Sequence, residues 1–334
     1  MAELLRFLRK VWRDYSKTAE RKRTVLFYRD FRGFTGGHLK VWHYFNHVLH
    51  APDYQPQITF SAETLWDGTN PWLPLRHQAL TQWNLNHANL LFLAGMDWSI
   101  LSEAQRCYPP RRIINLIQHV RHGDPKEALY QYLRHRAVRI CVSEPVAEAL
   151  RASGQVNGPL FTIPNGIDLQ DLPKPKAWEE RQTDVLVVGI KQPTLASEIA
   201  SHIKNWDRRT TILTVPLPRA AFIDLLNNSK ISVFLPHSTE GFYLPALEGF
   251  AVGTLVICPD CIGNRSFCLP GRNCLQPPLY TKECLLETIQ KALRLLPEKR
   301  LSLLDAAQLT AQQHTLLEER RAFLKILGQI ETLS

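Results

Sequence analysis

Residues 233–257 read VFLPHSTEGFYLPALEGFAVGTLVI, and this stretch carries the strongest structural signal in the chain. It overlaps an apolar run at residues 231–235 that is typical of a buried strand, and it ends in a second such run at residues 255–258. Pro245 suits the first turn of a helix between the two runs. Strand, loop, helix and strand in this order predict one unit of a parallel β-sheet.

Two acidic residues flank the start of that predicted helix, Glu240 before it and Glu248 one turn into it. The helix dipole stabilises an acid at this position by about 0.3–1 kcal/mol, so a purely structural role would explain their presence. However, the loop amides and the helix N-terminus would also attract a phosphate, and carboxylates accept hydrogen bonds from the hydroxyls of a sugar or ribose. The stretch therefore has the residue types of a nucleotide or sugar site.

The same alternation of strands and helices extends in both directions along the chain. The predicted strands are residues 24–28, 57–60, 90–94, 113–118, 138–142, 160–163, 184–188, 211–215, 231–235 and 255–258. The predicted helices are residues 38–50, 125–134, 144–152, 194–203, 219–227, 245–251, 282–296 and 297–333. Buried strands that alternate with helices predict an α/β protein, with parallel sheets covered by helices on both faces. Ligands of such sheets bind beyond the carboxyl ends of the strands.

The length of 334 residues suggests two domains, at about 150 residues each. We expect a basic leader helix over residues 1–23, an N-terminal domain over residues 24–175 and a C-terminal domain over residues 176–310. A closing helix over residues 311–334 is expected to pack back towards the N-terminal domain. The proline-rich and charged range 173–183 is the expected linker.

The formal charge of +9 is unevenly distributed, because residues 1–23 hold eight cations against three acids. On a helix, the apolar side chains of this leader fall on one side and its cations on the other. Such a helix can lie in an anionic membrane surface or dock on protein, and the sequence favours neither. The rest of the chain is only mildly basic, which argues against bulk nucleic-acid binding.

Seven cysteines, an odd number, occur without a secretory signal and indicate a reducing, cytosolic compartment. Four of them lie close together at Cys258, Cys261, Cys268 and Cys274. Their spacing is irregular and no His completes a usual ligand set, so buried small hydrophobes are favoured over a zinc site. The sequence contains no apolar run of the roughly 18 residues that predict a membrane span.

The stretch at residues 233–257 resembles the signature of retaining nucleotide-sugar glycosyltransferases with the GT-B fold. This large family includes glycogen synthase, sucrose synthase and phosphatidylinositol mannosyltransferases. Its Glu-x7-Glu motif matches Glu240 and Glu248, and further segments look like its other motifs in the same order. These segments are Gly36-Gly37, residues 161–168 (FTIPNGID) and residues 259–273 (PDCIGNRSFCLPGRN). The resemblance covers residues 24–334.

The resemblance implies two Rossmann-like domains that face each other across a cleft, an N-terminal acceptor domain and a C-terminal nucleotide-sugar donor domain. It implies transfer of a sugar to an acceptor hydroxyl with retention at the anomeric carbon. No cofactor and no metal is expected, and no Asp-x-Asp follows a strand to hold a divalent ion. The expected acceptor is a cell-surface glycan or lipid-linked saccharide at the cytoplasmic leaflet, and nucleic acid is not an expected partner.

By the same resemblance, Glu248 binds the ribose hydroxyls of the donor and Glu240 lies beside the donor sugar. The backbone amides of three residues are expected to face the diphosphate or the sugar: Phe242, Tyr243 and Leu244. Lys191 supplies a cation for the departing diphosphate. Arg265 is the candidate to replace a second cation that the family carries and that this chain lacks.

The N-terminal domain contributes three further candidates. Gly36 and Gly37 would form a glycine loop whose amides approach the donor, although a plain turn between strand and helix explains them equally well. His119 follows the strand at residues 113–118, where the family often has a functional His, and a structural role is equally open. Two other functions stay open as well: a non-catalytic membrane-associated scaffold or binding protein, and a GT-B epimerase that acts on the donor sugar.

Overall fold

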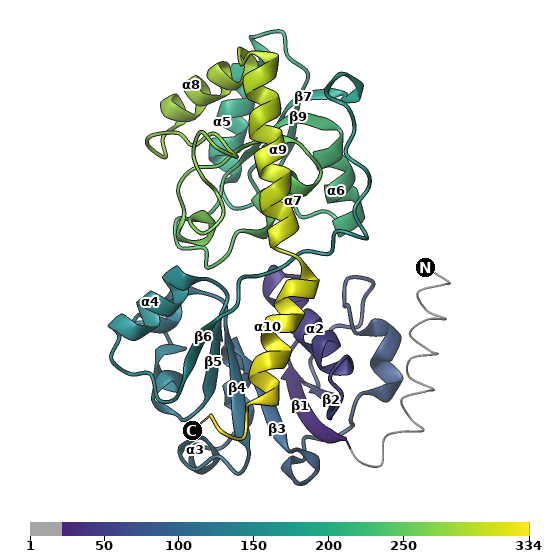
Figure 1. The fold of residues 1–334 in the computed structure, drawn as a ribbon, viewed down its shortest axis with the longest axis vertical. Coiled ribbons are helices and arrows are strands. Elements are labelled where there is room, and N and C mark those ends of the chain that lie inside the picture. Colours follow the sequence, from purple (N-terminus) through teal and green to yellow (C-terminus); the bar gives the residue numbers. More distant parts are fainter. Residues whose placement is uncertain (1–21, 334) are drawn as a thin grey trace. The chain divides into compact units, whose positions relative to one another are not determined.

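The computed structural model describes residues 22–333, which form two compact units (Figure 1). The first unit contains the chain as far as Val142, then Ala147–Ile163 and the closing segment from Arg320. The second unit contains Ser143–Val146 and Pro164–Glu319. The leader predicted at residues 1–23 lies almost wholly outside the described residues, so its amphipathic helix remains a prediction.

Six parallel strands form the sheet of the first unit in the order β2-β1-β3-β4-β5-β6. They are β1 (Arg23–Arg29), β2 (Tyr54–Phe60), β3 (Leu90–Ala94), β4 (Arg112–Ile117), β5 (Val138–Cys141) and β6 (Leu160–Thr162). Every residue of β3 is buried, as expected for a strand covered on both faces. β2 contains Pro56, which lacks a backbone donor and is tolerated because β2 is an edge strand.

Helices of the first unit include α2 (Gly36–Leu49) and the short α3 (Glu103–Cys107). The closing segment packs on the same sheet, since the ring of Phe323 lies 4.9 Å from that of Tyr44 on α2 and 6.2 Å from that of Phe92 on β3. The helix α4 (Glu144–Ala152) follows β5 and has the predicted bounds.

The helix predicted at residues 125–134 is wrong. The chain there forms the short 3₁₀ turn η6 (Tyr130–Arg134), and another, η5 (Val120–Gly123), precedes it. At the end of this segment, the buried guanidinium of Arg139 donates hydrogen bonds to the carbonyl oxygens of Tyr132, Leu133 and His135 at 2.6–3.0 Å. The amides of this segment bond three residues back, as in His135 to the Tyr132 carbonyl at 3.3 Å, and Arg139 satisfies the buried carbonyls at its end.

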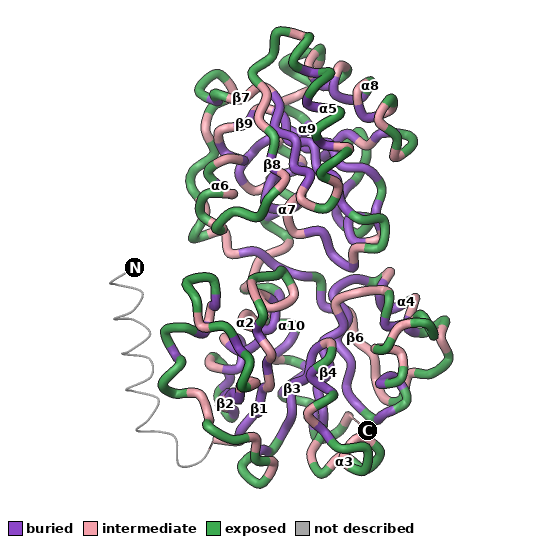
Figure 2. Tube along the Cα trace, turned by 180° about the vertical axis from the view of Figure 1, so that it is seen from behind, coloured by how far each residue is buried: buried purple, intermediate pink, exposed green. Residues whose placement is uncertain are grey.

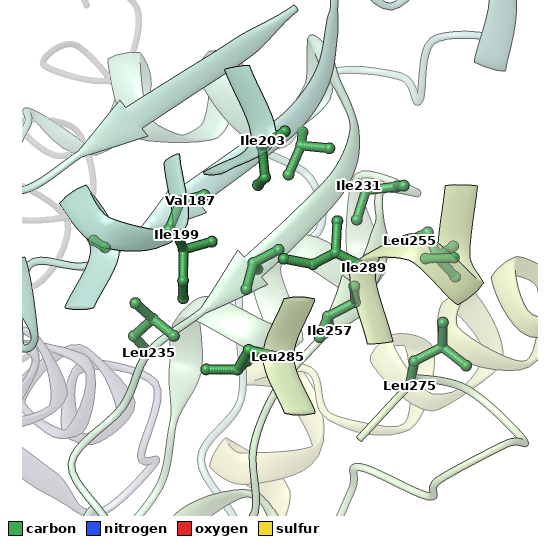
Figure 3. Packing of buried hydrophobic residues seen from close by; sticks show 14 of the residues in the cluster. Val187, Ile199, Ile203, Ile231, Leu235, Leu255, Ile257, Leu275, Leu285 and Ile289 are labelled. Atoms are coloured by element: carbon green, nitrogen blue, oxygen red, sulfur yellow. The ribbon is translucent and has the colours of Figure 1, made fainter. Parts of the chain in front are cut away.

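The second unit has four parallel strands in the order β10-β9-β7-β8. They are β7 (Thr183–Val188), β8 (Thr210–Leu213), β9 (Ser229–Phe234) and β10 (Leu255–Ile257). The helices are α5 (Pro193–Lys204), α6 (Arg219–Asn227), α7 (Leu244–Ala251), α8 (Lys282–Leu293) and α9 (Pro297–Gln313). Figure 3 shows the core, where Val187 and Ile231 of the sheet lie near Ile199 of α5 and Ile289 of α8.

The single helix predicted at residues 297–333 is also wrong, because α9 ends at Gln313 and α10 (Leu316–Gly328) begins after a break. At the break, the Ile167 amide donates to the carbonyl of His314 at 2.9 Å, and the Leu316 amide donates to the carbonyl of Ile167 at 3.0 Å. Gly166 allows this approach, since a Cβ atom there would lie 2.3 Å from the Thr315 carbonyl oxygen.

All ten predicted strands are present, and the predicted α/β class with parallel sheets is confirmed. Figure 2 shows that the buried segments concentrate in the strands of both sheets, with exposed loops around them. Within residues 22–333, no helix combines the length and the apolar character needed to cross a membrane.

Candidate active site

The order of strands in the second unit identifies the point of the sheet at which ligands usually bind. β7 and β9 are neighbours, and the chain continues from β7 to β8 on one side and from β9 to β10 on the other. Adjacent parallel strands whose connections diverge leave a crevice beyond their carboxyl ends, which is where α/β sheets bind ligands. Two predicted site residues follow these strands, Lys191 after β7 and Glu240 after β9.

Lys191 and Glu240 lie near each other at that crevice. The Lys191 Nζ is 4.0 Å from the Glu240 Oε1, and the two side chains are 51% and 19% exposed. A long, solvent-exposed pair of this kind contributes about 1 kcal/mol at most. Breaking this ion pair to bind a ligand would therefore cost little free energy.

The loop that carries Glu240 is braced by the loop after β10. The Ile262 amide donates to the Ser238 carbonyl at 3.0 Å, and the Tyr243 amide donates to the Gly263 carbonyl at 3.1 Å. A Cβ atom at Gly263 would lie only 2.7 Å from the Glu240 carbonyl oxygen. Glycine is thus required at this position for the two loops to pack, and the packing fixes the backbone of Glu240.

The same contacts show which of the three amides predicted to face a ligand already have a backbone acceptor. The Tyr243 amide is engaged by Gly263, and the Leu244 amide donates to the Phe242 carbonyl at 3.3 Å. Within the described residues, the Phe242 amide has no backbone acceptor. The ring of Phe242 lies 5.0 Å from that of Phe267, and a ligand role for the three amides remains a prediction.

Glu248 lies on α7 with a side chain that is only 6% exposed, and it forms an ion pair with Arg219 at the start of α6. Burial raises the pKa of the Glu248 carboxyl, and the Arg219 guanidinium opposes that rise. Sequence reasoning missed Arg219. A signal was present, because a cation in the first turn of a helix opposes the helix dipole and needs another explanation.

Arg265 follows β10, but its charge is already paired within its own loop. Its Nη2 and Nε donate to the Asp260 carboxylate at 2.6 and 3.0 Å, and this pairing lowers the pKa of Asp260. The arginine side chain is 53% exposed. Serving as a second cation for a diphosphate would require Arg265 to leave Asp260.

The first unit has an equivalent opening between β1 and β3, since the chain leaves β1 towards β2 and leaves β3 towards β4 on the other side. A cavity of about 250 Å³ lies there, and Gly37 contributes to its lining. Gly36 and Gly37 do not form a loop before the helix as predicted, because they are the first two residues of α2. The Thr35 hydroxyl caps this helix by accepting from the His38 amide at 3.2 Å.

Three residues of this cavity escaped the sequence analysis: Arg29, His38 and Asp97. The Arg29 Nη1 donates to the Asp97 carboxylate at 2.6 Å, and its Nη2 lies 2.8 Å from the His38 Nδ1. Burial raises the pKa of Asp97 to about 6. Burial and the Arg29 charge lower the pKa of His38 to about 4. Two of them could have been found from their position in the sequence, because Arg29 and Asp97 lie at or just after the ends of apolar strands.

His119 follows β4, where its Nδ1 accepts a hydrogen bond from the Arg121 amide at 3.1 Å and caps η5. Its neighbour Gln118 lines the cavity and donates to the Gly37 carbonyl at 3.2 Å. Among the described residues that line the cavity, His119 is not present. The structure therefore gives His119 a capping role, and a ligand role remains a proposal.

The four clustered cysteines are buried, and burial raises the pKa of the Cys261 and Cys268 thiols. Throughout residues 22–333, no group of three or more His, Cys, Asp and Glu side chains is arranged to hold a metal ion. The cysteines pack instead as small apolar side chains around the loop after β10.

Comparison with known proteins finds similarity in structure alone. No protein-family model matches the chain, and no curated protein matches its sequence. Sucrose-phosphate synthase from Thermosynechococcus elongatus is 13% identical, with a TM-score of 0.72 over 93% of this chain and 100% of the other. Anabaena HepE in complex with UDP-glucose is 12% identical, with a TM-score of 0.70 over 92% and 99%.

A glycosyltransferase from Rickettsia africae is 14% identical, with a TM-score of 0.65 over 94% of this chain and 100% of the other. At such low identity, these similarities bear on the fold and leave the activity open. The neighbours are GT-B glycosyltransferases, and the chain has the GT-B fold that its motifs predicted.

Proposed function

We propose that the protein is a glycosyltransferase that moves a sugar from a nucleotide-sugar donor to an acceptor hydroxyl, with retention at the anomeric carbon. The observation that carries this proposal is the placement of Lys191 and Glu240 4.0 Å apart beyond the ends of β7 and β9. The buried Glu248 on α7 supports it. The structural neighbour HepE was solved with UDP-glucose, which makes a nucleoside diphosphate sugar the donor class to test first.

In this proposal, the reaction breaks the bond between the anomeric carbon and the donor diphosphate through an oxocarbenium-like state. Lys191 stabilises the charge that develops on the departing diphosphate, together with the Phe242 amide and the N-terminus of α7. Glu248 accepts hydrogen bonds from the ribose hydroxyls, and Glu240 lies beside the donor sugar. A lysine supplies the positive charge, so chelation of divalent metals should leave turnover unchanged.

The acceptor belongs, in the same proposal, to the cavity of the first unit beside Gly36 and Gly37. A cell-surface glycan or lipid-linked saccharide is the acceptor class that we infer. The basic leader would hold the enzyme on the cytoplasmic face of a membrane. Deletion of residues 1–17 should then release the protein from vesicles that contain anionic lipid, measured by co-sedimentation, and unchanged partition would show that the leader has another role.

The proposal is tested by a thermal-shift screen of nucleoside diphosphates and their sugars, followed by turnover assays with the nucleotide that binds. We expect one nucleoside diphosphate to raise the unfolding temperature, and Lys191→Ala to lower turnover much more than it lowers stability. A chain that no nucleotide stabilises would be a scaffold rather than an enzyme. Formation of epimerised or free sugar without an acceptor would indicate an epimerase.

A further inference from the structure

The cavity of the first unit is small and is built from the ends of its central strands. Its volume is about 250 Å³, below the roughly 300–1,000 Å³ of pockets that hold drug-sized ligands. Its lining includes Tyr28, Arg29 and Asp30 from the end of β1 and Asp97 from the turn after β3. A space of this size suits one ring of a ligand.

The positive charge of Arg29 is neutralised by a buried ion pair with Asp97. Arg29 and Asp97 form an ion pair at 2.6 Å, with side chains that are 10% and 6% exposed. The Asp97 carboxylate also accepts from the Ala94 amide at 2.9 Å, and Arg29 donates to the Ala94 carbonyl at 3.3 Å. A buried pair satisfied on both sides presents little net charge to a ligand, while the Arg29 Nε has no acceptor among the described residues.

The second nitrogen contact of Arg29 determines the protonation of His38. A guanidinium can only donate, so the His38 Nδ1 at 2.8 Å from the Arg29 Nη2 must accept. The single proton of the neutral ring therefore resides on Nε2. The positive charge of Arg29 and the burial of the ring both oppose a second proton, while Asp30 acts in the opposite direction. His38 thus carries a neutral Nε2–H donor, and the residue is part of the cavity lining.

The remaining lining carries no unpaired cation. Asp30 is bound by the Ser61 hydroxyl at 2.5 Å and by the Arg32 Nε at 2.7 Å. Gln118 contributes an amide side chain. The N-terminus of α2 adds partial positive charge, and the Thr35 hydroxyl caps it. An anionic ligand would meet no free positive side chain there, whereas hydroxyls would find both donors and acceptors.

We propose that this cavity binds an uncharged, hydroxyl-bearing ring, the terminal sugar of the acceptor, through the Nε2–H of His38. Arg29 and Asp97 act as positioning residues that hold His38 in this tautomer. The assignment of the ring to the acceptor rests on the proposed glycosyltransferase function. The binding itself can be measured on the full chain without turnover.

The first experiment is NMR of the full chain with ¹⁵N-labelled histidine. His38→Gln identifies the His38 signals, and His87→Gln, at an exposed site in η3 (Leu85–His87), is the matched control. We expect His38 to carry its proton on Nε2 and to stay neutral from pH 8 to about pH 6, since an unperturbed histidine titrates near pH 6.5. A proton on Nδ1, or ionisation above pH 6, would overturn the proposal.

The second experiment adds matched sugars to the same sample at about 10 mM, tenfold above a millimolar Kd. The probes are the methyl glycosides of glucose, galactose, mannose and N-acetylglucosamine, and the 6-phosphates of the same sugars. We expect at least one neutral glycoside to shift the His38 signals and its phosphate to bind at least tenfold more weakly. Equal binding of the phosphate, or no response to any neutral glycoside, would reject the proposal.

Variants distinguish a residue that contacts the sugar from residues that position it. His38→Ala should weaken the glycoside by about 3- to 10-fold, as for one lost hydrogen bond. The double variant Arg29→Met with Asp97→Leu avoids an unpaired buried charge, and it should let His38 populate both tautomers and weaken the glycoside. Nucleotide binding to the second unit, measured by thermal shift in the same variants, reports whether the chain is folded. If the natural chain binds no nucleotide, the proposed transferase function is rejected. The glycoside measurements would still test the sugar site.

Discussion

The carboxylates of Glu248 and Asp97 are more than nine-tenths buried, and each forms an ion pair with an arginine from another element. Removing the arginine from such a pair would leave an uncompensated buried charge, a change that typically costs 3–5 kcal/mol. The sequence motif indicates Glu248, whereas its partner Arg219 lies 29 residues earlier, outside the motif. The Arg29–Asp97 pair joins residues 68 positions apart, and no local pattern connects them.

Glu248→Gln keeps the size of the side chain and removes its charge. If Glu248 receives the ribose hydroxyls, the variant loses charge-assisted hydrogen bonds worth about 1.5–3 kcal/mol, so nucleotide affinity should fall by roughly 10- to 150-fold. Isothermal titration with the nucleotide found in the screen measures this change. Glu198→Gln, at an exposed site on α5, is the control, and an equal affinity for both variants would remove Glu248 from the donor site.

His38 and Asp97 should affect the pH dependence of stability with opposite signs. The pKa of Asp97 is raised to about 6, so its contribution to the free energy of unfolding falls as pH rises from about 4 to 6. The pKa of His38 is lowered to about 4, so its contribution rises over nearly the same range. In the natural chain the two contributions offset each other.

Single variants should reveal each contribution in turn. Relative to the natural chain, His38→Gln should lose stability as pH rises from 4 to 6, and Asp97→Asn should gain stability over the same interval. Urea unfolding at pH 4.5 and pH 6.5, followed by tryptophan fluorescence, measures both slopes. Slopes of the same sign in the two variants would show that the groups do not titrate as described.

At the scale of elements, most of the fold follows from local signals. Apolar runs of four to six residues identified all ten strands, and the signal is strongest in a central strand such as β3, which is buried along its whole length. At both wrong helices, backbone groups are bound by residues that lie outside the predicted helix. The Arg139 side chain binds the carbonyls of Tyr132, Leu133 and His135, a few residues earlier in the sequence, whereas Ile167 pairs with the distant backbone at Thr315.

The contact between the loops after β9 and β10 predicts the effect of Gly263→Ala. The added methyl group would meet the backbone of Glu240 and Phe242 at 2.7 Å, so the loop must move and the stability should fall by about 1–3 kcal/mol. Turnover should fall further than stability accounts for, because Glu240 is displaced. The control is Gly68→Ala, where a Cβ atom meets nothing within 4 Å. Equal turnover in the two variants would mean that the position of this loop does not matter.

At the scale of the whole molecule, each unit contains one fully buried arginine that binds main-chain carbonyls, Arg139 in the first and Arg181 in the second. Arg181 donates to the carbonyl oxygens of Lys176, Ser229 and Val252 at 2.8–2.9 Å. These carbonyls come from the segment before β7, from β9 and from the end of α7. One side chain thus joins parts of the second unit that are far apart in sequence.

Arg181→Met should destabilise the second unit by about 3 kcal/mol or more, because several buried carbonyls lose a charged donor. The effect should be confined to one unit, so hydrogen exchange of peptides is a better measure than a single melting temperature. We expect faster exchange in β7 and β9 and no change in β1 and β3. Arg208→Met, at an exposed site, is the control, and uniform acceleration of both units would contradict two separate cores.

The amino-acid sequence was sufficient for the class of fold, the number and place of the strands and the two glutamates of the motif. Those features depend on neighbours within about ten residues, through periodicity, turns and helix ends. The partners of the site residues depended on tertiary structure, since the strand order brings loops from different parts of the chain to one edge of each sheet. Arg219 beside Glu248, the brace of Gly263 on Glu240 and the Arg29–His38–Asp97 cluster follow from that order, because contacts between loops arise only when the strands beneath them are paired.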